Sequence, residues 1–256
     1  MREPPRPTMP SLEMLCARLP GVLQEASQTK VTRLPRGFEP HGPRSPMAPR
    51  LSYGRHRGPE HDGVRRAAVL IALYPAASNG ELVVTLTRRP LSLLHHAGQV
   101  CLPGGKIEPN ESAAEASIRE FVEELGAEPP TRQPLGEMQP TYVFASSNVV
   151  TPIIVAGRSP ESPWDPDPAE VDEVIEMPLQ AVIPEGTDSN LNAAGWRLGK
   201  RSGSSQREEP IEYRFRYPAI AFTDTRGQRR EIWGATAIIL ERFGRLIRSV
   251  LDEHSS

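Results

Sequence analysis

The chain has 256 residues, of which 28 are proline, about twice the usual share of ~5%. Its 30 basic and 32 acidic side chains give a net charge of −2, which excludes the strongly basic balance of a nucleic-acid-binding protein. No apolar run reaches the ~18 residues of a membrane-spanning helix, and the first ten residues lack the apolar core of a signal peptide. Cys16 and Cys101 form no disulfide or metal-binding pattern. We therefore expect a cytoplasmic protein that binds neither nucleic acid nor membrane.

Residues 1–65 are predicted to form a partly flexible leader, because they contain eleven of the prolines. Within this leader, residues 11–26 carry apolar side chains at helical spacing, which predicts one short amphipathic helix. Pro20 predicts a break or kink in that helix, since proline lacks the backbone donor of a helix interior. The ordered domain is expected to comprise residues 66–252.

The ordered domain contains more predicted strands than helices. A buried strand at 67–75 is followed by an Asn79-Gly80 hairpin turn, a returning strand at 81–89 and an irregular segment to Gly105. A helix is predicted over 110–125, ending at Gly126. The remaining predictions are strands at 139–144, 148–156, 171–179, 211–221 and 229–233, an exposed loop or insertion at 185–209, and a closing helix at 235–251. Helices that follow runs of strands indicate an α+β class, with a mixed sheet between helices as an α/β/α sandwich.

The helix at 110–125 carries an unusual group of acidic side chains. Glu120, Glu123 and Glu124 stand at i, i+3 and i+4, so their carboxylates share one helical face and repel one another. A solvated acidic surface is one interpretation. The alternative is a metal site, because hard divalent cations prefer oxygen ligands and the preceding Gly104-Gly105 pair lets the backbone approach an ion or a phosphate closely.

The segment 104–127 resembles the Nudix box, G-x5-E-x7-R-E-U-x-E-E-x-G-U, in which U is a bulky apolar residue. All seven fixed positions are filled at the correct spacing: Gly105, Glu111, Arg119, Glu120, Glu123, Glu124 and Gly126. Phe121 and Ala127 occupy the U positions, and Ala127 is small for its place. The resemblance implies a Nudix fold and a diphosphate-cleaving hydrolase.

The resemblance also implies roles for single residues. Glu120, Glu123 and Glu124 would hold Mg²⁺ or Mn²⁺ together with the Gly105 carbonyl. Catalytic roles would fall to Glu120, Glu124 and Arg119, with Arg119 orienting a neighbouring glutamate. Family members differ in the general base, so Glu120, Glu124 and an acid outside the box all stay open. The structural residues of the motif would be Glu111, which holds the loop against the helix, and Gly126.

Residues 86–105 are similar to the upstream signature of coenzyme A pyrophosphatases, L-L-T-x-R-[SA]-x3-R-x3-G-x3-F-P-G-G. The matching positions are Leu86, Thr87, Arg89, Gly98, Pro103, Gly104 and Gly105, and the departures are Pro90, Leu94 and Leu102. Leu94 removes a cation that an anionic substrate would use, and Arg88, His95 or His96 would have to replace it. VDEVIEMPL (171–179) and EIWGATAIIL (231–240) resemble further segments of the subfamily. We assign substrate binding to Arg89, His96 and Gly104.

The resemblance implies that coenzyme A or an acyl-coenzyme A is cleaved to 3′,5′-ADP and 4′-phosphopantetheine or its acyl form. Two alternatives remain. One is a hydrolase of another nucleoside diphosphate derivative such as ADP-ribose, which Leu94 favours; the other is a non-catalytic binding module with the same fold. Whether the chain forms a homodimer is also left open.

Overall fold

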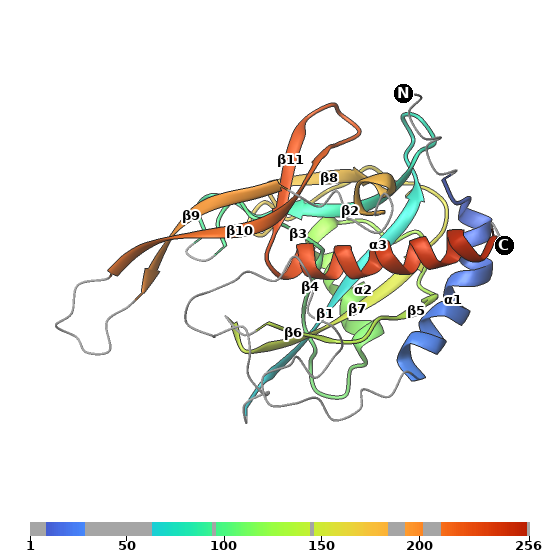
Figure 1. The fold of residues 1–256 in the computed structure, drawn as a ribbon, viewed down its shortest axis with the longest axis horizontal. Helices are drawn as coiled ribbons and strands as arrows, with labels where there is room; N and C mark the ends of the chain where they lie inside the picture. Colours follow the sequence, from blue (N-terminus) through green and yellow to red (C-terminus); the bar gives the residue numbers. More distant parts are fainter. Residues whose placement is uncertain are drawn as a thin grey trace.

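Two β-sheets and three α-helices make up the part of the chain that the structure, a computed structural model, describes: residues 9–28, 63–93, 96–143, 146–183, 193–201 and 211–254 (Figure 1). The elements follow in the order α1 Leu12–Gln28, β1 Arg65–Pro75, β2 Leu82–Arg88, β3 Val100–Cys101, β4 Gly104–Lys106, α2 Ala113–Leu125, β5 Gly136–Glu137, β6 Thr141–Val143, β7 Asn148–Ala156, β8 Glu173–Pro178, the 3₁₀ helix η2 Leu179–Val182, β9 Ala193–Arg201, β10 Ile211–Thr223, β11 Arg229–Trp233 and α3 Ala235–His254.

Strand β1 is the centre of the larger, eight-stranded sheet. It pairs antiparallel with β2 and β4, and it pairs parallel with β7 over a register that runs from Arg65 opposite Asn148 to Leu73 opposite Ala156. Parallel neighbours need a long crossover connection, and α2 lies in the connection between β1 and β7. The mixture of parallel and antiparallel pairs confirms the predicted mixed sheet.

The turn between β1 and β2 forms at the predicted Asn79-Gly80. Gly80 takes the left-handed conformation with φ 73°, and its N–H donates to the Ala76 carbonyl at 2.8 Å. The Ala76 N–H in turn donates to the Glu81 carbonyl at 2.8 Å, which closes the hairpin.

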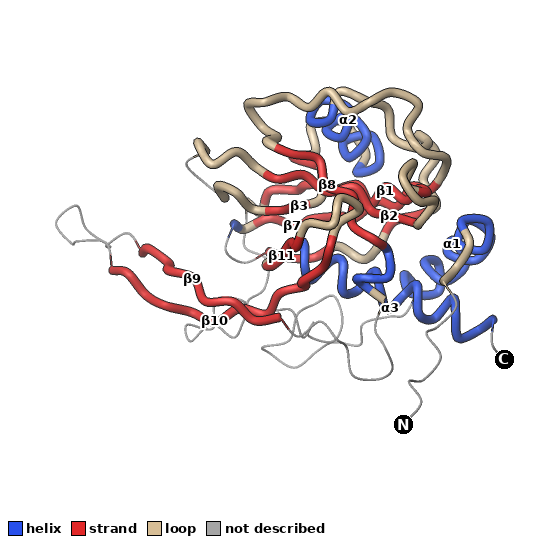
Figure 2. Tube along the Cα trace, turned by 90° about the horizontal axis from the view of Figure 1, so that it is seen from above, coloured by secondary structure: helices blue, strands red, loops and turns tan. Residues whose placement is uncertain are grey.

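Helices cover both faces of the large sheet, α2 on one side and α1 with α3 on the other (Figure 2). Successive side chains of a strand point to opposite faces. Accordingly, Leu70 and Ala72 of β1 pack in the apolar cluster that contains α2, whereas Ile71 and Leu73 pack in the cluster that contains α1 and α3. The α+β class with a sheet between helices is confirmed.

Helix α1 is continuous through Pro20, so the predicted break is wrong. Leu15, Leu19 and Leu23 are almost fully buried in the main core. Burial of a leucine side chain stabilises by about 1.5–3 kcal/mol, and three of them offset the cost of ~3 kcal/mol for an interior proline. The helix that the sequence analysis placed in the leader thus contributes to the core of the domain; residues 29–62 of that leader lie outside the described part.

The segment 185–209, predicted to be an exposed loop or an insertion, contains strand β9, so residues 193–201 are not a loop; the insertion stays a prediction. β9 pairs antiparallel with β10 over nine residues, from Ala193 opposite Ala219 to Arg201 opposite Ile211. The resulting hairpin extends away from the large sheet (Figures 1 and 2). The Gly, Ser and Asn content predicted a loop, but cross-strand pairing determines strand formation more than intrinsic preference does.

The segment 90–105, predicted to be irregular, contributes two short strands. β3 pairs with β2, and β4 pairs with β1. Each is only two or three residues long, and its conformation depends on a partner that is distant in the sequence rather than on a local pattern.

Replacing Leu19 by alanine tests whether α1 is part of the domain core. Because Leu19 is fully buried, we expect Leu19→Ala to lower the free energy of unfolding by about 2–5 kcal/mol, measured by urea denaturation. Gln24→Ala, at an exposed position of the same helix, is the control and is expected to change it by about 0.5 kcal/mol or less. Equal effects of the two substitutions would contradict the packing of α1.

Candidate active site

Helix α2 begins at Ala113, three residues later than the predicted start at Asn110. The Ser112 hydroxyl accepts a hydrogen bond from the Glu115 N–H at 3.2 Å, and the Glu115 carboxylate accepts one from the Ser112 N–H at 2.8 Å. These reciprocal bonds form a capping box, which satisfies free donors of the first turn. Asn110 itself is in a left-handed turn with φ 67°.

The other end of α2 is fixed by Gly126. Its φ of 64° is left-handed, and its N–H donates to the Val122 carbonyl at 2.9 Å, as expected of a glycine that ends a helix. A β-carbon at Gly126 would overlap the Asp165 carbonyl. The Asp165 N–H donates to the Leu125 carbonyl at 3.0 Å, so the loop that follows β7 is held against the end of α2.

Arg119 joins α2 to the loop that precedes it. Its guanidinium donates to both carboxylate oxygens of Glu111, at 2.9 and 3.1 Å, and to the Lys106 carbonyl at 3.0 Å. Glu111 also accepts a hydrogen bond from the Glu108 N–H at 3.0 Å. The bond from Arg119 is the main reason that the pKa of Glu111 lies below its ordinary value.

The same guanidinium reaches two of the three clustered glutamates. Its Nη1 donates to Glu120 at 2.9 Å and to Glu123 at 3.0 Å. The Glu120 side chain is 17% exposed and that of Glu123 is 59% exposed. Burial raises the pKa of Glu120, and this effect outweighs the opposing influence of Arg119.

Gly104 and Gly105 bring the backbone of β4 against this group. A β-carbon at Gly105 would overlap the Glu120 carboxyl group. A β-carbon at Gly104, where φ is 146°, would overlap the Ala68 carbonyl of β1. Only glycine allows the sheet backbone to lie so close to the carboxylates of α2.

Glu124 is the most deeply buried acid of the cluster, with 5% of its surface exposed. Its Oε2 has no hydrogen-bond partner among the described residues. Burial, followed by the negative charges of Glu170 and Glu120, raises its pKa to about 8; Arg89 and the Gly104 N–H act in the opposite direction. The carboxyl group thus occupies an environment that disfavours its ionised form unless a cation is near.

Arg89 lies close enough to Glu124 to lower its pKa. Its backbone closes the following loop, because the Arg89 N–H donates to the Gln99 carbonyl and the Gly98 N–H donates to the Arg89 carbonyl, both at 3.0 Å. His96 lies exposed in that loop with φ 58°, and its Nδ1 is 2.7 Å from Gln99 Oε1. The structure therefore places Arg89 at the carboxylate cluster, while the His96 ring is bonded to Gln99 rather than to a carboxylate.

Glu170 is an acid of this site that the sequence analysis did not single out. Its negative charge raises the pKa of both Glu120 and Glu124. It is carried by a turn in which the Asp167 N–H donates to the Glu124 carbonyl at 3.1 Å and the Val171 N–H donates to the Asp167 carbonyl at 2.8 Å. Glu170 lies 46 positions after Glu124 in the sequence, in a run of several acids, so no local pattern distinguishes it.

The oxygen ligands of this site are of the kind that binds a hard divalent cation. Among the described residues, however, no three His, Cys, Asp or Glu side chains lie close enough together to hold a metal ion as they stand. Glu120, Glu123 and Glu124 supply carboxylate oxygens, the ligands that Mg²⁺ and Mn²⁺ prefer. The buried Oε2 of Glu124 lacks a partner among these residues, and the bare backbone at Gly105 faces Glu120.

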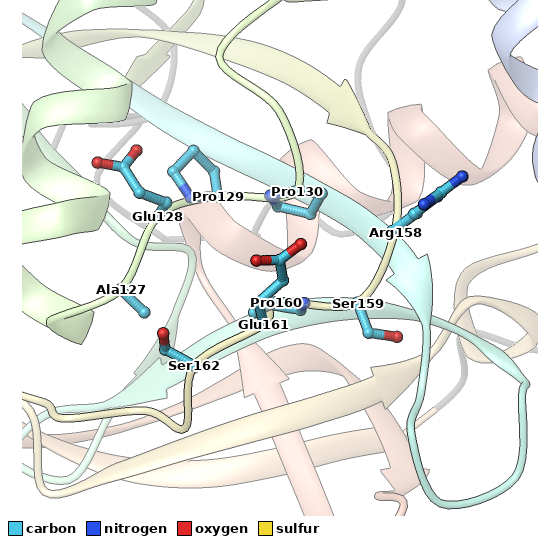
Figure 3. Close-up of a pocket in the computed structure, with 9 residues that line it drawn as sticks. All are labelled: Ala127, Glu128, Pro129, Pro130, Arg158, Ser159, Pro160, Glu161 and Ser162. Atoms are coloured by element: carbon cyan, nitrogen blue, oxygen red, sulfur yellow. The ribbon is translucent and has the colours of Figure 1, made fainter.

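A cavity of about 350 Å³ lies elsewhere, past the C-terminal end of α2 (Figure 3). It is lined by residues 127–130 and 158–162. The carboxylate of Glu161 points toward the 127–130 segment, whereas the side chain of Arg158 points away. None of the candidate site residues lines this cavity.

The buried position of Glu124 makes the stability of the metal-free protein depend on pH. Between about pH 4.5 and pH 8 the folded state holds a proton on Glu124 that the unfolded state releases, so the free energy of unfolding falls as the pH rises through this range. Glu124→Gln stays neutral. We therefore expect its stability relative to the parent protein to increase from about pH 5 to about pH 8, measured by urea denaturation in EDTA. A constant difference between the two proteins would contradict the raised pKa.

Comparison with known proteins places this site in a family. The sequence profile of the NUDIX domain matches residues 64–195, about half of the chain. Nudix hydrolase 15, mitochondrial, from Arabidopsis thaliana is 30% identical over 193 residues, covering 73% of this chain and 60% of that protein. Nudix hydrolase 22, chloroplastic, from the same plant is 30% identical over 188 residues, covering 70% and 54%. The uncharacterized Nudix hydrolase NudL of Salmonella newport is 36% identical over 123 residues, covering 48% and 62%.

This chain spans less than two thirds of the length of these curated relatives. Among solved structures, a MutT/nudix family protein from Enterococcus faecalis is similar with 18% identity and a TM-score of 0.41, covering 77% of this chain and 67% of that one. The matched profile, however, includes β4, α2 and all of the acidic residues described above. The chain therefore belongs to the NUDIX domain family.

Proposed function

We propose that the protein is a metal-dependent hydrolase of a small diphosphate substrate. The observation that carries this proposal is the electrostatic coupling of four carboxylates, three from α2 and Glu170 from a distant turn, with the cation of Arg89 acting on Glu124. Such a concentration of negative charge is unfavourable in a protein alone and suits a site that binds Mg²⁺ or Mn²⁺.

In this proposal Glu120, Glu123 and Glu124 hold the metal, with the Gly105 carbonyl as a further ligand. The metal, when bound, would neutralise phosphate charge and polarise the phosphorus–oxygen bonds. Arg119 keeps Glu120 and Glu123 in place through its hydrogen bonds and binds Glu111 on its other side. Arg89, near the buried end of the cluster, is the cation available to bind a phosphate oxygen.

The reaction would join the oxygen of a water molecule to one phosphorus and release the bridging oxygen with the other phosphate. A carboxylate must accept the proton that the water loses. Three acids are candidates for this general base: Glu120, Glu124 and Glu170. In the protein without metal, burial is the main cause that raises the pKa of both Glu124 and Glu120, so both hold a proton more readily than an ordinary glutamate.

The substrate that we propose is coenzyme A or an acyl-coenzyme A. The support is the similarity of residues 86–105 and of two later segments to that subfamily. Of its three departures, Leu102 is apolar, like the phenylalanine of the signature, and is buried in the main core. Pro90 is also buried, and Leu94 lies outside the described residues.

Arg88 is a poor replacement for the cation absent at position 94. Its guanidinium is paired with Asp172 at 2.7 Å and with Glu173 at 3.2 Å. The cation of the coenzyme A signature is therefore not replaced by Arg88. Its absence at Leu94 favours the second candidate, a hydrolase of another nucleoside diphosphate such as ADP-ribose. A binding module without turnover is a weaker alternative, because all of the box carboxylates are retained.

The proposed partner is a small diphosphate, and no helix of the described residues is long and apolar enough to cross a membrane. A cytoplasmic location stays a prediction, since the names of two relatives refer to mitochondria and chloroplasts. Association into a homodimer also stays a prediction.

A panel of diphosphates tests the substrate. With Mn²⁺ present, we expect coenzyme A to yield 3′,5′-ADP, resolved by chromatography, with a higher kcat/KM than ADP-ribose, because specificity is a ratio of these values. A higher kcat/KM for ADP-ribose would select the second candidate. If no diphosphate were cleaved at high enzyme concentration, only the binding module would remain.

Substitution of Glu124 tests the catalytic centre itself. Glu124→Gln removes a buried metal-facing charge while keeping the volume of the side chain, so we expect kcat to fall by about a hundredfold or more. Glu128→Gln, an exposed glutamate just past α2, is the matched control and should retain parental activity. Equal trace activity of the Glu124→Gln variant and the parent protein would rule out the catalytic assignment.

A further inference from the structure

Arg230 of β11 is a buried arginine that no part of the proposed function uses. Its side chain is 8% exposed, and it donates to both carboxylate oxygens of Glu173, at 2.9 and 2.6 Å. Its Nε donates to Asp224 at 2.9 Å, and Asp224 is 2% exposed. A planar guanidinium with two carboxylate partners in fixed geometry restrains both of them strongly.

Glu173 is the first residue of β8, and the acid Glu170 is three positions before it in the chain. Two further contacts bind the segment between them to β2. The Asp172 N–H donates to the Arg88 carbonyl at 2.8 Å, and the Asp172 carboxylate pairs with the Arg88 guanidinium at 2.7 Å. Arg88 also pairs with Glu173, at 3.2 Å.

The turn that carries Glu170 is therefore held at both ends. At its start, the Asp167 N–H is bonded to the Glu124 carbonyl of α2 at 3.1 Å. At its end, Glu173 is held by the fork of Arg230. These contacts hold the backbone of the turn, and the Glu170 N–H itself donates to the Asp167 carbonyl at 3.0 Å, so Glu170 is kept next to the part of α2 that carries Glu124.

We propose that Arg230 is a positioning residue, which acts through Glu173 to keep the turn that carries Glu170 in place beside the metal-binding carboxylates. This inference rests on the proposed function, in which those carboxylates hold Mg²⁺ or Mn²⁺. The simpler interpretation is that Arg230 only attaches the turn between β10 and β11 to the large sheet. The two interpretations differ in whether the effect of Arg230 depends on Glu170.

A double-mutant cycle on Mn²⁺ binding separates them. The dissociation constant for Mn²⁺ is measured from the electron paramagnetic resonance signal of free Mn²⁺, for the parent protein, Arg230→Met, Glu170→Gln and the double variant, below the melting temperature of each. We expect Arg230→Met to weaken binding by about three- to tenfold in the parent and by less than about twofold in the Glu170→Gln background, since residues that act as one unit are not additive.

Two further variants serve as controls. Arg229→Met, at an exposed neighbouring position of β11, should leave Mn²⁺ binding unchanged. Arg230→Lys keeps the positive charge but cannot donate to both carboxylate oxygens of Glu173 as the guanidinium does. Its dissociation constant for Mn²⁺ should lie between those of the parent protein and Arg230→Met. It replaces Arg230→Met if that variant does not fold.

The proposal is overturned if Arg230→Met lowers the melting temperature but leaves Mn²⁺ binding intact, if its effect is the same with and without Glu170, or if Glu170→Gln alone does not weaken binding. These results leave the proposed hydrolysis standing, because the diphosphate panel is a separate measurement. Conversely, if Arg230 and Glu170 are coupled in Mn²⁺ binding but the protein cleaves no diphosphate, the proposed hydrolysis is refuted and the positioning role of Arg230 stands.

Discussion

The attachment of α2 to the sheet through Arg119 is the interaction on which the rest of the site depends. One guanidinium binds Glu111 before the helix, the backbone carbonyl of Lys106 at the end of β4, and two glutamates within the helix. Without it, the acids on this face would repel one another and the preceding loop would lose its connection to the helix. Glycines 104 and 105 allow the approach, because a β-carbon at either position would overlap neighbouring atoms.

This arrangement concentrates charge that is unfavourable without a cation. Glu124 is almost fully buried and has a raised pKa, and Glu170 adds a negative charge from a turn outside the helix. The surrounding structure withstands this because apolar clusters pack on both faces of the large sheet, one with α2 and the other with α1 and α3. The unfavourable free energy of the clustered charges is thus offset by apolar burial elsewhere in the domain, as is usual at functional sites.

Much of the fold was predictable from local patterns. The nearly continuous burial of β1 and β2, the Asn-Gly turn and the acidic helix ended by Gly126 all follow from local features of the sequence. The predictions that were wrong involve contacts distant in the sequence. Pro20 is tolerated because leucines of α1 meet the α3 side of the sheet, and β9 forms because β10 pairs with it.

The amino-acid sequence by itself determined the spacing of the carboxylates on α2, the glycines beside them and the family to which these belong, since all lie within one short segment whose geometry follows from helical periodicity. Only the tertiary structure decided which other groups join them. Arg89 follows the end of β2, and Glu170 lies on a turn after β7; both act on the pKa of Glu124. Arg88 is paired with Asp172 and Glu173 and is therefore a poor candidate for binding substrate. The physical reason is that strand pairing and helix packing bring these segments together, and no local pattern in the sequence encodes the distance between them.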